Sequence, residues 1–364
     1  MADLKDLRAK INEIDKEIAS LFCKRMQISK EIALFKKENG IDVFDQSREQ
    51  EVIKQNLLFV DKEYQDYYVN FIKELMNESK RYQSSLLVGK RIAYSGVPGA
   101  FAYIAAKKMY PDCIYVPYPN FKEAYLACEN GETDYLVLPI ENSSAGEVGE
   151  VLDLIFDGDL KINKMCDLEI DHYLLGPKGS KKEDIKIVYS HSQAISQCEE
   201  YLNKNNIDAI PSVNTAVAAK NIKELNDCTI GAIASIETAE LYDLDILDSK
   251  INESRNNSTR FASFSRTMRT PSQDTKMGEH FILVYTVINK AGALADTLNI
   301  IGSHNFNMRN VKSRPMKDLM WNYYFFVEIE GNVNSKDGQD LLKELSSICD
   351  RLKLVGTYYD FKEK

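Results

Sequence analysis

The stretch that decides how this chain divides is Asn256-Asn257-Ser258-Thr259-Arg260-Phe261, in which five polar residues are closed by a phenylalanine. Asn, Ser and Thr hydrogen-bond locally and favour loops over helices, so we expect a loop here. The stretch ends a long region patterned as alternating strands and helices, and a polar linker follows it. A helical region precedes the alternating region, and a compact module follows the linker. We therefore expect three modules, with a small-molecule site in the middle module that residues 256–261 close.

The composition is that of a globular protein with an acidic balance. The 364 residues suggest two or three domains, and the net charge of −9 argues against bulk binding to nucleic acid or an anionic membrane. An anionic substrate would therefore need a local cationic pocket. The seven cysteines are scattered without a C-x-x-C motif and the four histidines lie far apart, so we expect no disulfide framework, metal or cofactor. The sequence shows no signal peptide and no apolar run long enough to cross a bilayer, which favours a cytoplasmic protein.

Residues 1–87 predict an all-helical module that begins with one long helix. Its apolar seam has heptad spacing. The seam consists of Leu4, Leu7, Ile11, Ile14, Ile18, Leu21, Arg25, Ile28, Ile32 and Phe35. A guanidinium at a seam position needs a partner, and Lys36 lies about 20° away on the same face and roughly 16 Å along the axis. Arg25 and Lys36 could hold a small anion between them. Arg8 lies roughly 25 Å from Arg25 and about 100° round, so it would reach such a pocket only from a partner subunit.

The later helices of this module carry further polar residues in unusual places. The first helix should end at Gly40, and Asp45 then resembles an N-cap that places Arg48 and Glu49 in the next first turn. A third helix should run from about residue 61 to 86, and its apolar stripe continues into Ser79 and Gln83. Taken singly, these polar residues fit solvated helix faces or a frayed helix end. Taken together, they favour a pocket.

At these spacings the module resembles the all-helical chorismate mutase family. The matching residues are Arg8, Arg25, Lys36, Asp45, Arg48, Glu49, Ser79 and Gln83. The resemblance implies rearrangement of chorismate to prephenate in a dimer of intertwined three-helix protomers. It also implies that Arg8 of the other subunit, Arg25 and Arg48 bind carboxylates, that Lys36 and Gln83 face the ether oxygen, and that Glu49 takes the ring hydroxyl. A pericyclic reaction needs a clamped conformer and polar groups aimed at developing charge, rather than an acid or a base.

Residues 90–266 predict two α/β lobes with a cleft between them. In the first lobe, a strand at 90–95 leads into a Gly-rich turn and a helix, and a strand at 134–138 leads into the polar loop 139–146. The turn is not G-x-G-x-x-G, which argues against a dinucleotide site, but polar loops at strand ends are where α/β sheets bind ligands. The pattern recurs from 185 to 242, so we expect a second lobe with crossings near Ile170 and Leu247. His191 fits either an acid–base residue or a turn residue bonded to backbone.

Four stretches of this region resemble prephenate dehydratase, the last being that family's signature. They are Tyr94-Ser95-Gly96-x-x-Gly99, Leu138-Pro139-Ile140-Glu141-Asn142-Ser143-Ser144-Ala145-Gly146, Tyr189-Ser190-His191-x-Gln193-Ala194 and Asn257-x-Thr259-Arg260-Phe261. The resemblance implies a two-lobed fold like that of periplasmic binding proteins, and loss of the ring hydroxyl and a carboxylate from prephenate to give phenylpyruvate. Thr259 matches the catalytic threonine. The implied pocket residues are Ser95, Glu141, Asn142, Ser143, Ser190, Gln193, Asn257, Arg260 and Phe261, where Arg260 either binds a carboxylate or braces the loop, and Glu141 could instead be a cap or salt-bridge partner.

Residues 279–361 predict a ferredoxin-like βαββαβ module after a linker at 269–278. Its strands are expected at 280–288, 305–313, 321–330 and 354–361, and its helices at 291–301 and 335–352. The module resembles the ACT regulatory domain, and the resemblance implies binding of L-phenylalanine as an inhibitor. The implied effector-binding residues are Gly292, Ala293, Leu294, Asn307, Ser313, Arg314 and Pro315. Lys312 departs from the family, which usually has glutamate there, so it could weaken effector binding or alter a packing salt bridge.

Three interpretations remain open at this point. The first is a fused, homo-oligomeric enzyme of phenylalanine biosynthesis that acts on chorismate and prephenate and binds neither nucleic acid nor membrane. The second is a two-lobed ligand-binding or sensor protein without turnover, because fold alone does not decide function. The third keeps the enzyme but replaces prephenate with arogenate.

Overall fold

The computed structural model describes residues 3–40, 46–254, 256–268, 279–316 and 322–359. The chain divides into two compact units, Met1–Lys90 and Arg91–Lys364, which are treated separately below. Within the described ranges no helix is both long and apolar enough to cross a membrane.

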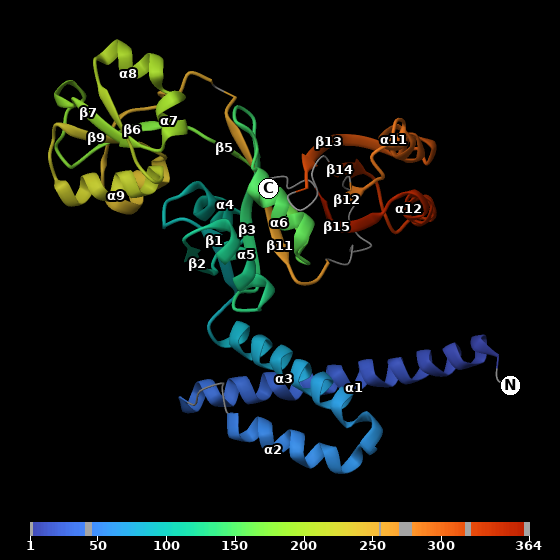
Figure 1. The fold of residues 1–364 in the computed structure, drawn as a ribbon. Helices are drawn as coiled ribbons and strands as arrows, with labels where there is room; N and C mark the ends of the chain where they lie inside the picture. Colours follow the sequence, from blue (N-terminus) through green and yellow to red (C-terminus); the bar gives the residue numbers. More distant parts are fainter. Residues whose placement is uncertain (1–2, 41–45, 255, 269–278, 317–321, 360–364) are drawn as a thin grey trace. The chain divides into compact units, whose positions relative to one another are not determined.

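The described residues of the first unit form three helices, and two short 3₁₀ turns lie between the second helix and the third (Figure 1). Its elements are α1 (Leu4–Asn39), α2 (Gln46–Asn56), η1 (Leu57–Phe59), η2 (Lys62–Tyr64) and α3 (Gln65–Leu87). Asp3 caps α1 by accepting from the amide of Lys5, and Gly40 ends it with a left-handed φ of 63°. The predicted long helix and its end at Gly40 are confirmed. The predicted cap at Asp45 lies outside the described residues.

The predicted apolar seam of α1 does not face α3. The apolar residues of the seam are between 43% and 62% exposed. The buried residues of α1 are instead Ser29 and Ala33, and Arg25, Met26 and Lys36 are half-buried on the same face. The apolar seam therefore does not contribute to the core of the single chain. The chain uses the adjacent face for its own packing and leaves a long apolar stripe on the surface, which is typical of a helix that packs against another chain.

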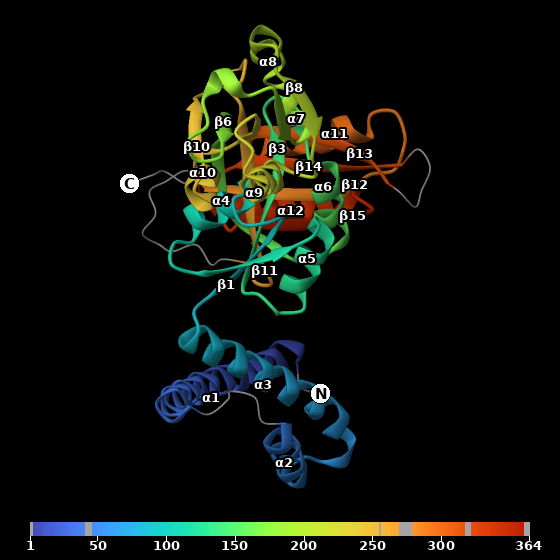
Figure 2. The same ribbon diagram turned by 90° about the vertical axis from the view of Figure 1, so that its left-hand side faces the viewer.

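The second unit contains the two lobes and the C-terminal module. The first lobe contains β1 (Arg91–Ser95), β2 (Ile114–Tyr118), β3 (Tyr135–Asn142), β4 (Gly146–Glu147), β5 (Lys161–Glu169), β11 (Ser258–Ser265), α4 (Phe101–Met109), α5 (Phe121–Glu129) and α6 (Gly149–Asp157). The second lobe contains β6 (Tyr173–Gly176), η3 (Lys182–Asp184), β7 (Ile187–Ser190), α7 (Ser192–Ser196), α8 (Glu199–Asn205), β8 (Asp208–Pro211), α9 (Thr215–Leu225), β9 (Ile230–Ala234), α10 (Ile236–Tyr242) and β10 (Asp245–Asp248). Figure 2 shows the two lobes from a second direction.

Two segments predicted as polar loops are strands in the structure. Strand β3 continues through residues 139–142, and β11 begins at Ser258, with Thr259 opposite Asn142 and Arg260 opposite Glu141. Strand β11 lies between β5 and β3, so backbone pairing on both sides overrides the local loop preference of Ser and Thr. The two-lobed prediction is confirmed, with a five-stranded sheet in the second lobe in the order β10-β6-β9-β7-β8.

The chain crosses between the lobes twice. The first crossing lies at Ile170, as predicted, and its amide donates to the carbonyl of Asn257 on the returning segment at 2.8 Å. The second crossing follows β10, so the prediction that it lies near Leu247 is wrong, because Leu247 belongs to that strand. The hydrogen bond between the two crossing segments brings residues 170 and 257 together at the junction of the lobes.

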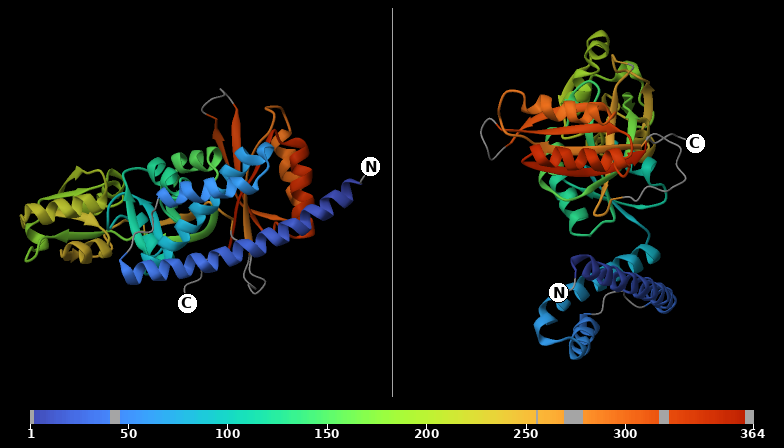
Figure 3. Two further views of the ribbon diagram at one scale, coloured as in Figure 1. Left: turned by 90° about the horizontal axis from the view of Figure 1, so that it is seen from below. Right: turned by 90° about the vertical axis from the view of Figure 1, so that its right-hand side faces the viewer.

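The C-terminal module has the predicted βαββαβ order. Its elements are β12 (Glu279–Thr286), α11 (Ala293–Ser303), β13 (Asn307–Pro315), β14 (Tyr323–Glu330), α12 (Lys336–Ile348) and β15 (Arg351–Tyr359). The predicted last helix is too long, since β15 already contains Leu352. Core residues of α11 and α12 pack together on alternate residues of β12 and β14, so both helices cover one face of the sheet (Figure 3).

The other face of this C-terminal sheet packs on the first lobe. Strand β15 pairs in parallel with β5 at Gly356 and Ile162, giving a ten-stranded sheet in which β13-β14-β12-β15-β5-β11-β3-β1-β2 are successive neighbours and β4 pairs with β3. A side chain at Gly356 would collide with the backbone of Ile162, so the close approach requires glycine. Ile282 and Phe326 of the module share one apolar core with Ile140 of β3 and Phe264 of β11. The C-terminal module therefore packs directly on the two strands that carry the signature motifs.

Candidate active sites

A pocket that contains Thr259 lies between the two lobes and has a volume of about 330 Å³. Ser95, Asn142 and Thr259 line it from the ends of first-lobe strands, while Gln193 and Thr215 line it from second-lobe helices. Strand ends and helix starts converge here because each lobe is built from βα units. This is the position at which an open α/β protein binds a small ligand.

The described lining of the pocket contains no lysine or arginine. Residues at the N-terminal ends of α4, α5, α7 and α9 line it, and no aspartate or glutamate does. Helix N-termini present unpaired amides and a partial positive charge, which suits carboxylate groups. We expected a cationic pocket for an anionic substrate, and the described lining instead contains helix N-termini and no charged lysine or arginine side chain.

Asn142 fixes the direction of the hydrogen bonds at Thr259. The Asn142 side-chain oxygen accepts from the backbone amides of Ser144 at 3.0 Å and Ala145 at 2.8 Å. Because backbone amides can only donate, the amide nitrogen of Asn142 must point the other way, where it lies 2.9 Å from Thr259 Oγ1. Thr259 therefore accepts from Asn142, and its own hydroxyl proton is left to donate to a ligand in the pocket.

Asn257 supports this arrangement from behind the pocket. It is 4% exposed, and its side-chain oxygen accepts from Asn142 Nδ2 at 2.9 Å. Its own amide nitrogen donates to Gln197 Oε1 at 3.0 Å. Asn257 thus orients Asn142 and is not among the residues that line the pocket.

The structure divides the predicted dehydratase residues into those that line the pocket and those that do not. Ser95, Asn142, Gln193 and Thr259 line it as expected. Ser190 is fully buried and donates to the carbonyl of Ile233, while Ser143 donates to the carbonyl of Asn256 and accepts from the amide of Ser258. Phe261 belongs to the core of the first lobe. These three residues have structural contacts, and expecting them in the pocket was wrong.

Arg260 and Glu141 contact the C-terminal module instead of the pocket. Arg260 Nη1 lies 2.9 Å from Glu328 Oε2, and its Nε lies 3.3 Å from Asp167 Oδ1. Burial acts to lower the pKa of Arg260, but Glu328, Tyr358 and Asp167 together outweigh burial, and the pKa is raised overall. Glu141 Oε2 lies 3.0 Å from Lys312 Nζ. Neighbouring side chains of a strand point to opposite faces, so Thr259 and Asn142 face the pocket while Arg260 and Glu141 face away.

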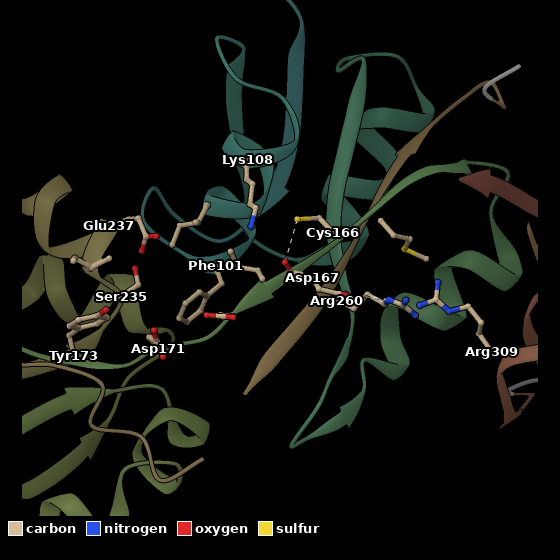
Figure 4. Close-up of a pocket in the computed structure, with 15 residues that line it drawn as sticks. Phe101, Lys108, Cys166, Asp167, Asp171, Tyr173, Ser235, Glu237, Arg260 and Arg309 are labelled. Carbon is tan, nitrogen blue, oxygen red and sulfur yellow. Dashed lines mark hydrogen bonds and ion pairs between the residues drawn. The ribbon is translucent and has the colours of Figure 1, made fainter. Parts of the chain in front are cut away.

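A second hollow of about 730 Å³ runs along β5, outside the pocket that contains Thr259 (Figure 4). Glu237, Ser235 and Tyr173 lie toward one end of it, and Arg260 and Arg309 lie toward the other. Four carboxylates line it, from Asp167, Glu169, Asp171 and Glu237. Arg260 is already paired with two acids, so this hollow suits a dianionic substrate less well than the pocket with Thr259 does.

The helical unit brings together part of the predicted mutase site. Arg25 Nη1 donates to the carbonyl of Leu75 at 3.3 Å and also contacts Ser79 Oγ. Burial lowers the pKa of Arg25. Ser79 and Gln83 are buried one turn apart on α3, and Gln83 Oε1 has no hydrogen-bond partner among the described residues. The two polar residues that interrupt the apolar stripe of α3 are therefore buried.

The remaining predicted mutase residues are more dispersed. Glu49 pairs with Lys80 of α3 at 2.8 Å, and Arg48 pairs with Glu51 at 2.6 Å on the surface. Lys36 is half-buried on the face of α1 that carries Arg25, whereas Arg8 is exposed near the start of the helix. A complete mutase pocket is therefore not formed by the described residues of one chain.

The predicted effector-binding residues lie on two elements of the C-terminal module. Gly292 has a left-handed φ of 87° at the start of α11, and Ala293 and Leu294 open that helix. Asn307, Ser313, Arg314 and Pro315 lie on β13, where Asn307 Nδ2 donates to Glu330 Oε2 at 2.9 Å. Arg314 is bound by the first lobe, with Nε 3.1 Å from Asp153 Oδ1 and Nη1 3.0 Å from Glu147 Oε1.

Sequence reasoning missed several residues of the pocket. Phe101, His172 and Gln197 line it but belong to none of the predicted motifs. His172 follows a strand at the first crossing, and this position was the available signal. His191 caps α7 by accepting from the amide of Gln193 at 3.3 Å, which supports its interpretation as a turn residue.

Comparison with known proteins identifies the class and then the family. The chain matches prephenate dehydratase over residues 92–269 and chorismate mutase type II over residues 7–84. The solved structure of prephenate dehydratase in complex with L-Phe from Arthrobacter aurescens has a TM-score of 0.68 and 25% identity, covering 74% of this chain and 89% of its own. The second unit therefore has the fold of a prephenate dehydratase, and the first is a helical chorismate mutase.

Two curated relatives extend the match to the whole chain and to a related substrate. A bifunctional chorismate mutase/prephenate dehydratase from Buchnera aphidicola subsp. Acyrthosiphon pisum (strain APS) is 31% identical, covering 96% of this chain and 95% of the relative. An arogenate dehydratase/prephenate dehydratase from Arabidopsis thaliana is 33% identical, covering 74% and 71%. The chain belongs to the family of bifunctional chorismate mutase/prephenate dehydratases, and it has both activities.

Proposed function

We propose that prephenate is dehydrated in the pocket between the lobes and that the Thr259 hydroxyl donates a hydrogen bond to the departing ring hydroxyl. The observation that carries this proposal is the fixed orientation of Asn142, which leaves the Thr259 proton directed to a ligand. In the reaction the C–O bond and the bond to the ring carboxylate break. Carbon dioxide leaves, and the departing hydroxide takes up one proton to become water. A donor aimed at the departing oxygen stabilises the charge that develops there.

The helix N-termini around the pocket would hold the two carboxylates of prephenate. Ser95, Gln193 and Thr215 add polar groups from both lobes. Binding between lobes also allows closure around the substrate, which excludes water and strengthens each hydrogen bond. Arogenate carries an amino group where prephenate has a keto group, and the Arabidopsis relative is named for both substrates. We favour prephenate because the described lining of the pocket offers no carboxylate for an ammonium group.

The mutase site is proposed to be completed by a second copy of the chain. The apolar seam of α1 is exposed along its length, and Arg8 lies on the same exposed helix. Pairing two such helices would bury both seams and would bring Arg8 of one chain toward Arg25, Lys36 and Gln83 of the other. Arg25 and Arg48 would then bind chorismate carboxylates, Lys36 and Gln83 would face the ether oxygen, and Glu49 would bind the ring hydroxyl.

L-Phenylalanine is proposed to inhibit the dehydratase through the C-terminal module, acting as an ACT domain. Gly292, with its left-handed φ, opens α11 and lets backbone amides approach a carboxylate. The Arthrobacter aurescens structure is a complex with L-Phe, which supports a phenylalanine site in this fold. Lys312 is paired with Glu141 of the first lobe, so its departure from the family pattern is accommodated as a packing ion pair between the modules.

A time course of the purified chain with chorismate tests these proposals together, with prephenate and phenylpyruvate measured separately. Prephenate should rise first and then give way to phenylpyruvate, and added L-phenylalanine should slow only the second phase. Prephenate that accumulates without phenylpyruvate would contradict the assigned dehydratase substrate, and the same assay with arogenate would then identify the alternative. Phenylalanine up to millimolar concentration without effect on rate or melting temperature would contradict the regulatory proposal.

A further inference from the structure

The pocket contains a buried histidine that none of the motifs includes. His172 lies at the crossing between β5 and β6 and is 1% exposed. Its Nε2 lies 2.9 Å from Gln197 Oε1, and its ring packs against Phe101 with centroids 6.0 Å apart. The ring lines the same pocket as Thr259, and its Nδ1 is buried without a hydrogen-bond partner among the described residues. A buried polar atom without a hydrogen-bond partner destabilises the folded protein, so we expect a ligand to pair with it.

A chain of hydrogen bonds determines which ring nitrogen of His172 carries the proton. It begins at the backbone amides of Ser144 and Ala145, which can only donate and which fix the side-chain oxygen of Asn142. The Asn142 nitrogen then donates to Asn257 Oδ1, and the Asn257 nitrogen donates to Gln197 Oε1. Because Gln197 presents an oxygen, the His172 Nε2 facing it must be the protonated nitrogen. Nδ1 therefore carries a lone pair.

The surroundings of His172 keep the ring neutral. Burial lowers its pKa, and the hydrogen bond to Gln197 and the charge of Asp171 oppose this only in part. Of the described residues that line the pocket, His191 is the other titratable group, and it is exposed. A neutral ring with a protonated Nε2 makes Nδ1 a hydrogen-bond acceptor.

The same hydrogen-bond chain thus leaves one donor on Thr259 and one acceptor on His172, and both residues line a single pocket. Thr259 donates because its oxygen already accepts from Asn142, and His172 accepts because its Nε2 already donates to Gln197. A hydroxyl group can accept one hydrogen bond and donate another, so it satisfies both. The ring hydroxyl of prephenate has this property, whereas the product phenylpyruvate has no ring hydroxyl.

We propose that His172 Nδ1 accepts a hydrogen bond from the ring hydroxyl of the substrate and holds its oxygen toward Thr259. The proposal rests on the proposed function, since it uses the pocket assigned to the dehydratase. His172 would then act as a specificity-determining residue that distinguishes the hydroxylated substrate from the aromatic product.

Two substitutions of His172 test the contributions of its two ring nitrogens separately. In His172→Gln the longer side chain places its amide near the position of Nε2, which keeps a donor for Gln197 and removes the acceptor at Nδ1. In His172→Asn the shorter side chain places its amide near Nδ1, so its oxygen can still accept while the bond to Gln197 is lost. The mutase activity of the same chain measures the amount of active first unit, and phenylpyruvate binding reports whether the second unit, which contains His172, is folded.

The measurement compares substrate with product. In His172→Gln, kcat/KM for prephenate should fall about tenfold, and the inhibition constant of phenylpyruvate should stay within about twofold of its normal value. His172→Asn should retain more of the prephenate specificity than His172→Gln. An unchanged kcat/KM in His172→Gln would overturn the proposal, as would equal losses for prephenate and phenylpyruvate, since these would indicate a purely structural residue.

A spectroscopic test does not depend on a His172 variant that folds. In ¹⁵N-histidine-labelled protein, His172 should show a protonated Nε2 and an unprotonated Nδ1 between pH 6 and 8. Prephenate bound to Thr259→Ala, which should consume it about 100- to 1000-fold more slowly than the wild type, should shift the Nδ1 resonance before turnover is complete, and phenylpyruvate should not. A protonated Nδ1, or equal shifts with both ligands, would overturn the proposal. Rapid turnover by Thr259→Ala would instead contradict the assigned dehydratase site.

Discussion

Arg260 of β11 and Glu328 of β14 form an ion pair in which Nη1 lies 2.9 Å from Oε2. The residue before Arg260 is Thr259, whose hydroxyl faces the pocket. In the same register, Asn142 faces the pocket and its neighbour Glu141 pairs with Lys312. Two adjacent strands thus carry the proposed catalytic groups on one face and the contacts to the C-terminal module on the other. A shift of that module would move the strands that position Thr259.

Removal of one partner of the buried pair should weaken the second unit. In Arg260→Met, Glu328 would keep its hydrogen bond from Tyr358 and the more distant Arg309, but it would lose its closest cation. We expect the free energy of unfolding of this unit to fall by about 3 kcal/mol, because a buried carboxylate would lack full compensation. Dehydratase turnover should fall and mutase turnover should not.

The double variant Arg260→Met/Glu328→Leu is the matched control. It removes both charges, so it should be less destabilised than Arg260→Met alone. Denaturant unfolding of the wild type, the single variants Arg260→Met and Glu328→Leu, and the double variant measures the coupling. Strictly additive effects would contradict a direct ion pair between these two side chains.

Reversal of the second contact tests whether Lys312 joins the modules. Lys312→Glu would place two carboxylates together at Glu141, and we expect a loss of about 1–2 kcal/mol of stability together with slower dehydration. The reversed pair Glu141→Lys/Lys312→Glu should regain much of both. If the reversed pair were no more stable and no faster than Lys312→Glu, the ion pair between residues 141 and 312 would not be the cause of the loss.

The sequence was sufficient to predict those features that depend on local chemistry. The end of α1 at Gly40 follows from a single residue and is observed. The strands through Glu141 and Thr259 could not be predicted in this way, because their polar side chains are satisfied by a pocket on one face and by another module on the other. Local loop preference was decisive in the prediction, whereas pairing with neighbouring strands is decisive in the fold.

The same limit applies to the candidate sites. Motifs identified Thr259, Asn142 and Asn257 because each lies within one of the stretches that resemble the family. His172 and Gln197 come from separate segments, and only the folded chain shows that they form one hydrogen-bond chain with Asn257. The heptad pattern found α1 correctly but could not show which of two adjacent faces packs within the chain.

The mutase rate should be nearly independent of pH from 6 to 8. Gln83, which we place at the ether oxygen, donates through an amide that does not titrate. Gln83→Glu would need a protonated carboxyl group to donate, so its rate should fall as pH rises through the pKa of that group. Initial rates across this pH range test the assignment, and a steep fall in the wild-type chain would contradict it.

The stability of the second unit should decrease as the pH falls below about 6.5. Burial lowers the pKa of His172 in the folded chain, so below the unfolded pKa the unfolded chain binds the extra proton first. The free energy of unfolding therefore decreases with falling pH across the window beneath the unfolded pKa. Calorimetric melting between pH 7.5 and 5.5 should show this decrease, and His172→Gln should show a smaller one. Equal slopes in both proteins would indicate that His172 is not buried in its neutral form.

Thr259→Ala gives the most direct test of the central claim, which is that the hydroxyl aimed by Asn142 performs the dehydration. The purified variant and the wild type would be given chorismate, with prephenate and phenylpyruvate followed in time. Removal of one donor at the developing charge should slow phenylpyruvate formation by about 100- to 1000-fold, while prephenate forms at the normal rate and accumulates. Phenylpyruvate formed by Thr259→Ala at the wild-type rate would contradict the account.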